Sequence, residues 1–327
     1  MKKVVKRILI PIVSLLLLIA IFLCGVNLYQ HIANKEFFAH VKKEFKIPGI
    51  SEGLVQQGMF KAEDGNILVC GYMADSSAPR IYLLDPSGKE VKYVSLMKNQ
   101  KPDTTHAGGL CVVDRYVLLC GDGGLNIYSY DDLLMAANGS EMEASGVLEI
   151  DCLHPAFCFA DAERLYFGEF YREQNYPTDP SHHMDSPSGE NRHAILLVCD
   201  LDQLRRDNFS KAEYTAVLSI PDLAQGFASD NKGTFCVSSS YALALSHLRF
   251  YNDPTAGEPK GTFTINGREY PLYYLDTDNM IKDVTMFPMA EEIYFDDGKL
   301  FVINESASSK YIFGKITGGG FVYSYEY

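Results

Sequence analysis

The 327-residue sequence lacks the short motifs that mark several large enzyme classes. It has no G-x-x-x-x-G-K-[ST] loop, no dinucleotide-binding glycine pattern, no H-E-x-x-H pair and no G-x-S-x-G elbow. Sites that depend on these motifs in nucleotide-binding enzymes, metalloproteases and α/β-hydrolases are therefore excluded. The absence of any C-x-x-C spacing likewise argues against a structural zinc site.

Basic residues are scarce, because 29 Lys and Arg oppose 42 Asp and Glu, a formal charge of −13. Lys2, Lys3, Lys6 and Arg7 lie in a tail without acidic residues, so residues 8–327 carry −17. This charge disfavours a nucleic-acid partner, since phosphate binding requires positive charge. Tryptophan is absent, whereas 21 Tyr and 19 Phe favour β structure.

Residues 8–28 contain no charged side chain and are long enough to cross a bilayer core of roughly 30 Å. The positive-inside rule predicts a cytoplasmic tail over residues 1–7, a signal anchor over 8–28 and an extracellular main domain held at the cell membrane. Two cleaved alternatives stay open. A signal peptide would have a shorter core and small residues before its cleavage site. A lipoprotein would be cut before Cys24, although bulky Phe22 and Leu23 precede it.

The seven cysteines that follow the apolar run form no evident disulfide framework. Five of them lie inside apolar stretches such as NILVCGY and TFCVSS, which predicts small buried residues in strands. Disulfides stay possible in an exported domain.

Residues 29–49 are predicted to form a juxtamembrane helix and linker, because Phe37, Phe38, Val41 and Phe45 follow a near-helical spacing before Pro48. From residue 50 to 327 the pattern changes to short strands of period two, separated by turns rich in Gly, Asp and Asn. Five segments repeat one hairpin, in which a small or acidic residue precedes a hydrophobic one: 56–72, 107–122, 154–169, 224–240 and 290–306.

These repeats predict an all-β propeller. Their origins lie 51, 47, 70 and 66 residues apart, and a third strand follows each hairpin. A fourth strand is expected in four of the units, at 90–97, 145–150, 214–220 and 270–275. Five blades are predicted, or six if an insertion at 171–193 or 261–275 contains another. The chain around residues 44–49 is placed to supply the outer strand of the last blade.

The residues that lead into the innermost strands are predicted to converge at one mouth of the central channel, where several blades can form a ligand pocket. They include Gln57, His106, His154, Gln225, Glu291 and Glu292. These side chains are candidates for ligand binding, or for hydrogen bonding around a water-filled channel. His106, His154 and Glu291 are also candidate ligands of a divalent metal, or a general base with its orienting partners.

A second candidate cluster follows the second strand of the last hairpin. It contains Asn304 and Glu305, with Ser306, Lys310 and Tyr311 nearby. Asp122 and Glu169 occupy comparable strand ends in other repeats, and such residues either cap blades or bind ligands. His182 and His183 are expected to lie in a solvated loop, because adjacent residues of an extended chain point to opposite sides.

Three stretches carry a resemblance: THAGGLCVVDRYVLLCG, AQGFASDNKGTFCVSSSY and MAEEIYFDDGKLFVINESASSKYIFG. They resemble bacterial exported propeller proteins with an H-A-G-G inner-strand motif, over roughly residues 50–327. The resemblance implies the fold and export, and no established activity. More distantly, the chain is similar to gluconolactonase- and NHL-type propellers, the first of which hold a divalent metal through carboxylate and Asn ligands. Glu291 matches one ligand position, whereas His106 and His154 replace the expected Glu, Asn and Asp set.

The sequence thus predicts a membrane-anchored extracytoplasmic propeller that binds a protein, glycan or small molecule at its channel mouth. One alternative is a metal-dependent hydrolase or lyase acting in the channel. Another is a scaffold of a cell-envelope complex that uses the loop 171–193 as its contact.

Overall fold

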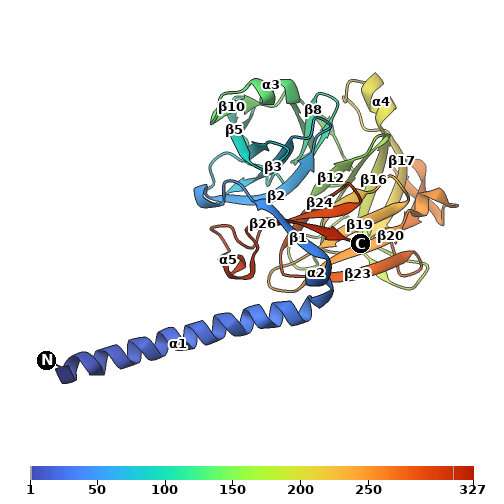
Figure 1. Cartoon of the computed structure of the whole chain (residues 1–327). Coiled ribbons are helices and arrows are strands. Elements are labelled where there is room, and N and C mark those ends of the chain that lie inside the picture. Colours follow the sequence, from blue (N-terminus) through green and yellow to red (C-terminus); the bar gives the residue numbers. More distant parts are fainter. Residues whose placement is uncertain (1, 312) are drawn as a thin grey trace.

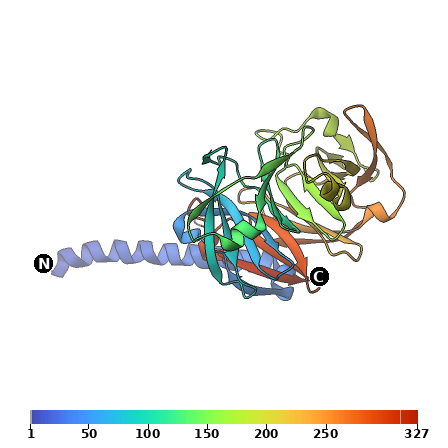
Figure 2. The same cartoon turned by 90° about the horizontal axis from the view of Figure 1, so that it is seen from above.

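Short strands separated by tight turns form five large β-sheets, which surround a common axis as the blades of a propeller (Figures 1 and 2). The computed structural model describes residues 2–311 and 313–327, with side chains from Leu9 onward. A long N-terminal helix projects from this β domain. The predicted all-β propeller with five blades is thereby confirmed.

Blades 1 to 4 each place their four main strands in chain order from the axis outward. Blade 1 contains β2 (Leu54–Lys61), β3 (Ile67–Met73), β4 (Arg80–Leu84) and β5 (Glu90–Lys98), extended by β6 (Lys101–Pro102) and β10 (Ser140–Glu143). Blade 2 contains β7 (Leu110–Val113), β8 (Tyr116–Gly121), β9 (Gly124–Ser129) and β11 (Gly146–Glu149). Blade 3 contains β12 (Phe157–Ala160), β13 (Arg164–Gly168), β16 (Ala194–Asp200) and β17 (Tyr214–Ile220). Blade 4 contains β18 (Ala224–Ser229), β19 (Thr234–Ser239), β20 (Ser246–Asn252) and β23 (Met280–Met286).

Blade 5 closes the ring by joining the two ends of the domain. Its strands β24 (Ala290–Asp296), β25 (Lys299–Asn304) and β26 (Phe321–Glu326) come from the C-terminus, and β1 (Val41–Lys46) comes from the N-terminus. β1 pairs antiparallel to β26, with Val41 opposite Tyr325. The expected outer strand near residues 44–49 is therefore present, shifted a few residues toward the N-terminus.

The helix expected across residues 29–48 is shorter than the spacing of its aromatic residues suggested. Helix α1 (Lys2–Ala33) is followed by α2 (Lys35–His40), and Val41 and Phe45 already lie in strand β1. Phe37 of α2 is fully buried and packs against Phe287 at 5.7 Å. Aromatic burial thus anchors both short elements to blade 5. The near-helical spacing of the apolar residues alone does not separate a six-residue helix from the strand that follows it.

The long insertions decorate existing blades and add none. Hairpin β21 (Gly261–Ile265) and β22 (Arg268–Tyr274) joins the outer edge of blade 3, where β22 runs parallel to β17. The prediction that residues 270–275 form the fourth strand of blade 4 was wrong, because β23 takes that place. Residues 171–193 fold over blade 3. The remaining short elements are β14 (Met184–Asp185), β15 (Asn191–Arg192), α3 (Tyr130–Met135), α4 (Leu201–Arg206), α5 (Gly314–Thr317), η1 (Ile50–Glu52), η2 (Pro180–His182) and η3 (Pro254–Ala256).

The central channel is filled at one level by a single side chain. Glu292 of β24 is 1% exposed, and its Oε2 accepts hydrogen bonds from the backbone N–H groups of Met59 at 2.8 Å and Leu110 at 3.1 Å. Gly58 and Gly109 leave the space that this carboxyl occupies, because a Cβ on either would lie within 2.8 Å of a Glu292 oxygen. The small residues at the start of the repeats therefore face the axis, and one blade fills what the others leave open.

The cysteines behave as small core residues. Cys70, Cys111, Cys120, Cys158, Cys199 and Cys236 are buried, and none of the cysteines in the described chain forms a disulfide. The prediction of small buried residues in strands is confirmed for the five that lie in apolar runs.

Candidate functional site

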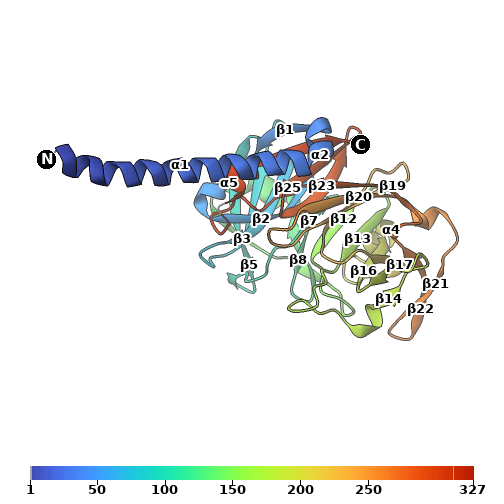
Figure 3. The same cartoon turned by 90° about the horizontal axis from the view of Figure 1, so that it is seen from below.

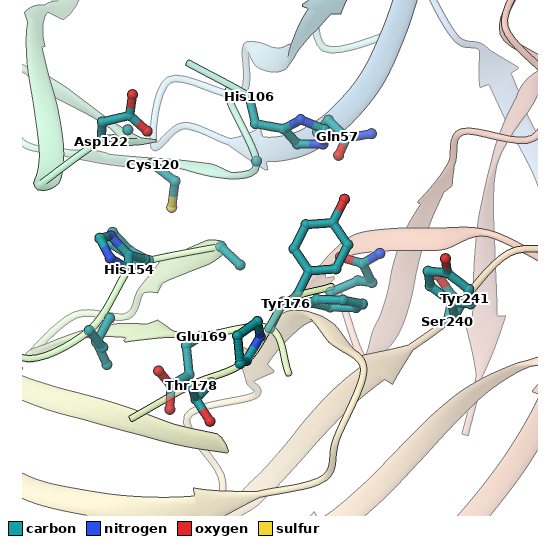
Figure 4. Close-up of a pocket in the computed structure, with 18 of the residues that line it drawn as sticks. Gln57, His106, Cys120, Asp122, His154, Glu169, Tyr176, Thr178, Ser240 and Tyr241 are labelled. Atoms are coloured by element: carbon teal, nitrogen blue, oxygen red, sulfur yellow. The ribbon is translucent and has the colours of Figure 1, made fainter. Parts of the chain in front are cut away.

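A cavity of about 1020 Å³ lies at one mouth of the channel. Inner strands start at this mouth and second strands end there, because the two are antiparallel. Two sets of side chains therefore reach the cavity, one from each strand type. Figure 4 shows several of them pointing into the common space.

The first set consists of residues that lead into the inner strands. Gln57, His106, His154 and Gln225 all line the cavity, although they come from four different blades. Gln57 donates from Nε2 to Glu305 Oε2 at 2.9 Å. His106 packs its ring against Tyr72, with a centroid distance of 4.5 Å. The structure thus brings these four predicted residues to one cavity.

The other predicted residues lie beneath this surface. Glu291 is buried below Gln225, whose Nε2 lies 3.5 Å from Glu291 Oε1. Glu292 plugs the channel and does not reach the rim. Asn304 is also buried, and it holds a turn by donating from Nδ2 to the Pro288 carbonyl and accepting from the Ser306 N–H at 2.9 Å. These three side chains support the cavity from behind.

The second set consists of residues at the ends of the second strands. Every blade contributes one cavity-lining member: Tyr72, Asp122, Glu169, Ser240 and Glu305. Sequence reasoning noted Asp122, Glu169 and Glu305 but missed Tyr72, Ser240 and the neighbouring Tyr241. The signal was available, since Tyr72 and Ser240 end their repeat segments at positions comparable to Asp122, Glu169 and Glu305, and Tyr241 follows directly.

The loop 171–193 forms one wall of the cavity. Tyr176 of this loop projects toward the middle of the site (Figure 4). The expectation that His182 is solvated was wrong, because its Nδ1 lies 2.7 Å from Glu169 Oε1 and the imidazole is buried. Glu169 also accepts from the backbone N–H of Ile195 at 3.0 Å. A buried carboxyl at a strand end thus gives the loop a fixed attachment that residue types alone did not indicate.

Burial makes the floor of the cavity nearly uncharged. Desolvation raises the pKa of Glu305 to about 7, although Gln57 and Lys310 act in the opposite direction. Desolvation raises the pKa of buried Glu291 well above its usual range, and the charges of Glu305 and Glu292 add to this effect. The concave walls and the charge of Lys310 lower the pKa of His106 to about 4, even though water reaches the ring. At neutral pH the imidazole of His106 is therefore uncharged, and the raised pKa of Glu291 favours its protonated form.

Among the residues that the structure describes, Lys310 is the single lysine or arginine on the cavity wall. Its ammonium donates to the Tyr72 hydroxyl at 2.8 Å and lies 4.8 Å and 5.5 Å from the ring centroids of Tyr72 and Tyr311. The positive charge is thus already engaged by two aromatic rings.

The described residues do not assemble the predicted metal site. No group of three or more His, Cys, Asp or Glu side chains in this part of the chain is arranged to hold a metal ion. His106 and His154 lie on different walls (Figure 4), and Glu291 is not among the cavity-lining residues. The residues at this site therefore do not form a donor set that fits a divalent metal.

Comparisons with known proteins identify no family for this chain. No protein-family model and no curated protein matches the chain. It is similar to the PQQ-bound aldose sugar dehydrogenase of Streptomyces coelicolor, with 13% identity, 87% of this chain and 96% of that chain covered, and a TM-score of 0.46. It is also similar to a putative glucose dehydrogenase of Thermus thermophilus (11% identity, 87% and 98% covered, TM-score 0.44) and to the nidogen/laminin complex (10%, 77% and 73%, 0.42). The resemblance to H-A-G-G, gluconolactonase- and NHL-type proteins stays a prediction.

Proposed function

We propose that this protein is an extracytoplasmic propeller, held at the membrane by α1, that binds a neutral glycan in the cavity at its channel mouth. The observation that carries the proposal is the combination of a nearly uncharged polar floor with a wall of tyrosines. Pockets that bind small molecules commonly join apolar surface to a few converging polar groups.

The floor favours a ligand with hydroxyl groups and no net charge. Gln57 and Gln225 offer amide donors and acceptors, and the imidazole of His106 is uncharged. The walls carry five carboxyl side chains, namely Asp122, Asp151, Glu169, Asp179 and Glu305. An anionic ligand would be repelled by these acids, and Lys310 is already engaged by tyrosines. The free energy of desolvating the anion would therefore exceed its favourable interactions with the cavity.

The wall favours a ring-shaped ligand with one apolar face. Tyr72, Tyr176, Tyr241 and Tyr311 surround the cavity and combine a flat ring with a hydroxyl group. The C–H face of a pyranose can stack on such a ring while its hydroxyl groups reach the amides of the floor. The volume of about 1020 Å³ accommodates more than a single sugar unit.

Membrane attachment is the second part of the proposal. Leu9–Ala33 is long and apolar enough to cross a membrane, and an N-terminal segment of this kind indicates the secretory pathway. Burial of Gln30 and Asn34 at the end of the helix supports retention of α1, since these residues belong to the folded domain.

The glycan proposal is tested by calorimetry of the purified full chain against neutral oligosaccharides and, in parallel, against uronic-acid oligosaccharides. We expect binding in the neutral set, weakened about tenfold by Tyr176→Ala, since losing an aromatic contact costs on the order of 1 kcal/mol. Tyr327→Ala, an exposed tyrosine that is not among the cavity-lining residues, is the matched control and keeps the affinity. Binding confined to the uronic acids would overturn the proposal.

The raised pKa of Glu305 favours a second function at the same site, general acid–base catalysis on a bound sugar. A carboxyl with a pKa of about 7 can donate and accept a proton at neutral pH. If this function is correct, oligosaccharides that bind are also cleaved, and Glu305→Gln abolishes turnover while leaving binding measurable. Bound oligosaccharides that persist unchanged with the wild-type chain would exclude it.

A further inference from the structure

The C-terminal turns of α1 are packed on the domain and do not float free of it. Leu23, Val26 and Asn27 are half-buried and Gln30 is buried, and these residues recur on one face of the helix. Beyond them, the Ala33 carbonyl accepts from Thr285 Oγ1 of β23 at 3.1 Å. Figures 1 and 3 both show α5 beside this part of α1. The angle and depth at which the helix meets the domain are therefore set by packing.

The length of the apolar run then fixes the height of the domain above the membrane. Residues 8–22 precede the packed face of α1. As a helix they span only about 22 Å, whereas a bilayer core is roughly 30 Å thick. A full crossing must include Leu23 and Val26, which already contact the domain. The surface packed against these turns, α5 above all, is consequently drawn to the level of the lipid headgroups.

The surface around α5 has the side chains that such a position requires. Ile316 is 40% exposed on α5, although it is a large apolar residue. Beside it lies a shallow cavity of about 700 Å³ that is bordered by Lys46, Lys89 and Lys315. No ion pair to these three lysines occurs within residues 9–311 and 313–327. Glu90 also borders this cavity, so three lysines lie with one carboxyl group here on a domain that is strongly acidic overall.

We propose that the surface formed by Ile316, Lys46, Lys89 and Lys315, the α5 surface, lies on the outer leaflet and binds the phosphate groups of anionic phospholipids. Ile316 enters the boundary between headgroups and acyl chains, and the lysines attract the negative lipid surface. This inference depends on the membrane attachment proposed above and is independent of the glycan proposal. Because Lys310 and Tyr311 precede α5 closely in the chain, the α5 surface would hold the glycan cavity near the bilayer.

The absence of tryptophan allows a direct measurement of depth. The full chain, with α1 verified by intact mass, is placed in lipid nanodiscs containing brominated phosphatidylglycerol and phosphatidylcholine. We expect Ile316→Trp to show blue-shifted emission and quenching by the brominated chains. Thr264→Trp is the control, because Thr264 is exposed on the β21–β22 hairpin at the far side of the domain from the start of α1. Equal quenching of the two tryptophans would overturn membrane contact.

The lysines are tested in the Ile316→Trp background. Replacing Lys46, Lys89 and Lys315 by Gln should remove the additional quenching seen in phosphatidylglycerol relative to pure phosphatidylcholine. The same change at exposed Lys101, Lys232 and Lys260 should leave it intact. Quenching that ignores both the anionic lipid and the three lysines would overturn phosphate binding. Oligosaccharide binding is measured on the same samples, so failure of the glycan proposal is distinguished from failure of this one.

Discussion

The most informative perturbation of this fold is Glu292→Gln at the centre of the channel. Desolvation raises the pKa of Glu292 well above its usual 4.5, and the nearby Cys158 adds to the effect. The folded chain therefore keeps this proton at neutral pH, whereas the unfolded chain releases it. Glutamine has nearly the shape of the protonated acid and keeps an acceptor for the Met59 and Leu110 N–H groups, so folding is preserved.

The sign and size of the effect follow from proton linkage. Between the unfolded and folded pKa values, the folded state binds the extra proton, so the free energy of unfolding falls as pH rises. The slope is at most about 1.4 kcal/mol per pH unit for one group, so the loss between pH 5 and 7 is about 2–3 kcal/mol. Glu292→Gln lacks this loss. Its stability relative to the wild type should therefore rise by about 2–3 kcal/mol between pH 5 and pH 7.

Guanidinium unfolding of the full chain in detergent, followed by circular dichroism from pH 5 to 8, measures this difference. Glu269→Gln on exposed β22 is the control and should run parallel to the wild type. Glu292→Ala should be destabilised at every pH, because each buried N–H left without an acceptor costs about 1–3 kcal/mol. Parallel wild-type and Glu292→Gln profiles would show that Glu292 is ionised in the folded chain and refute the reasoning.

Three further predictions concern packing, protonation and the loop. Gly109→Ala places a Cβ 2.5 Å from Glu292 Oε1 and 2.9 Å from Phe157 Cα, so thermal unfolding should show a free energy of unfolding lower by about 1–3 kcal/mol. Gly146→Ala is the control and should be tolerated, because the nearest atom to its Cβ lies at 3.8 Å. Infrared titration should reveal a carboxyl group with a pKa of about 7 that Glu305→Gln removes, and persistence of that signal would contradict the assignment. His182→Ala leaves Glu169 without its partner, so limited proteolysis should cut within 171–193 faster than in the wild type or in His40→Ala; unchanged cleavage would mean that other contacts hold the loop.

The blades were predictable because their information is local and repeated. A hairpin that repeats five times predicts the order of the strands. Four of the inner strands begin with a small residue because the axis is crowded, and Glu292 of the fifth occupies the space that they leave. The exceptions are elements whose place depends on distant partners. The segment 270–275 has the pattern of a strand, but the choice between blade 4 and the edge of blade 3 depends on pairing with β17, which local sequence does not encode.

The site divides along the same line. Gln57, His106, His154 and Gln225 were predictable because each lies within three residues of the small residue that opens an inner strand, and the five strand-end residues from Tyr72 to Glu305 lie at comparable repeat positions. The roles of these residues could not be found in this way, because a role depends on how many groups gather and how far water is excluded. The raised pKa of Glu305 depends on burial by blades that are distant in sequence, and the lowered pKa of His106 depends on the cavity walls and on the charge of Lys310.

The order of the loop 171–193 was not predictable from its own residues. Its composition is that of a solvated connection, and His182 next to His183 adds nothing to suggest order. Glu169 gives the loop its attachment. The repeat places this residue at the end of β13, where it is buried and therefore requires hydrogen-bond partners. A charged residue at a strand end that the fold must bury thus predicts that a nearby long insertion will return to satisfy it. In this chain that return brings Tyr176 over the cavity, so the same contact that stabilises the loop also completes the aromatic wall of the proposed glycan site.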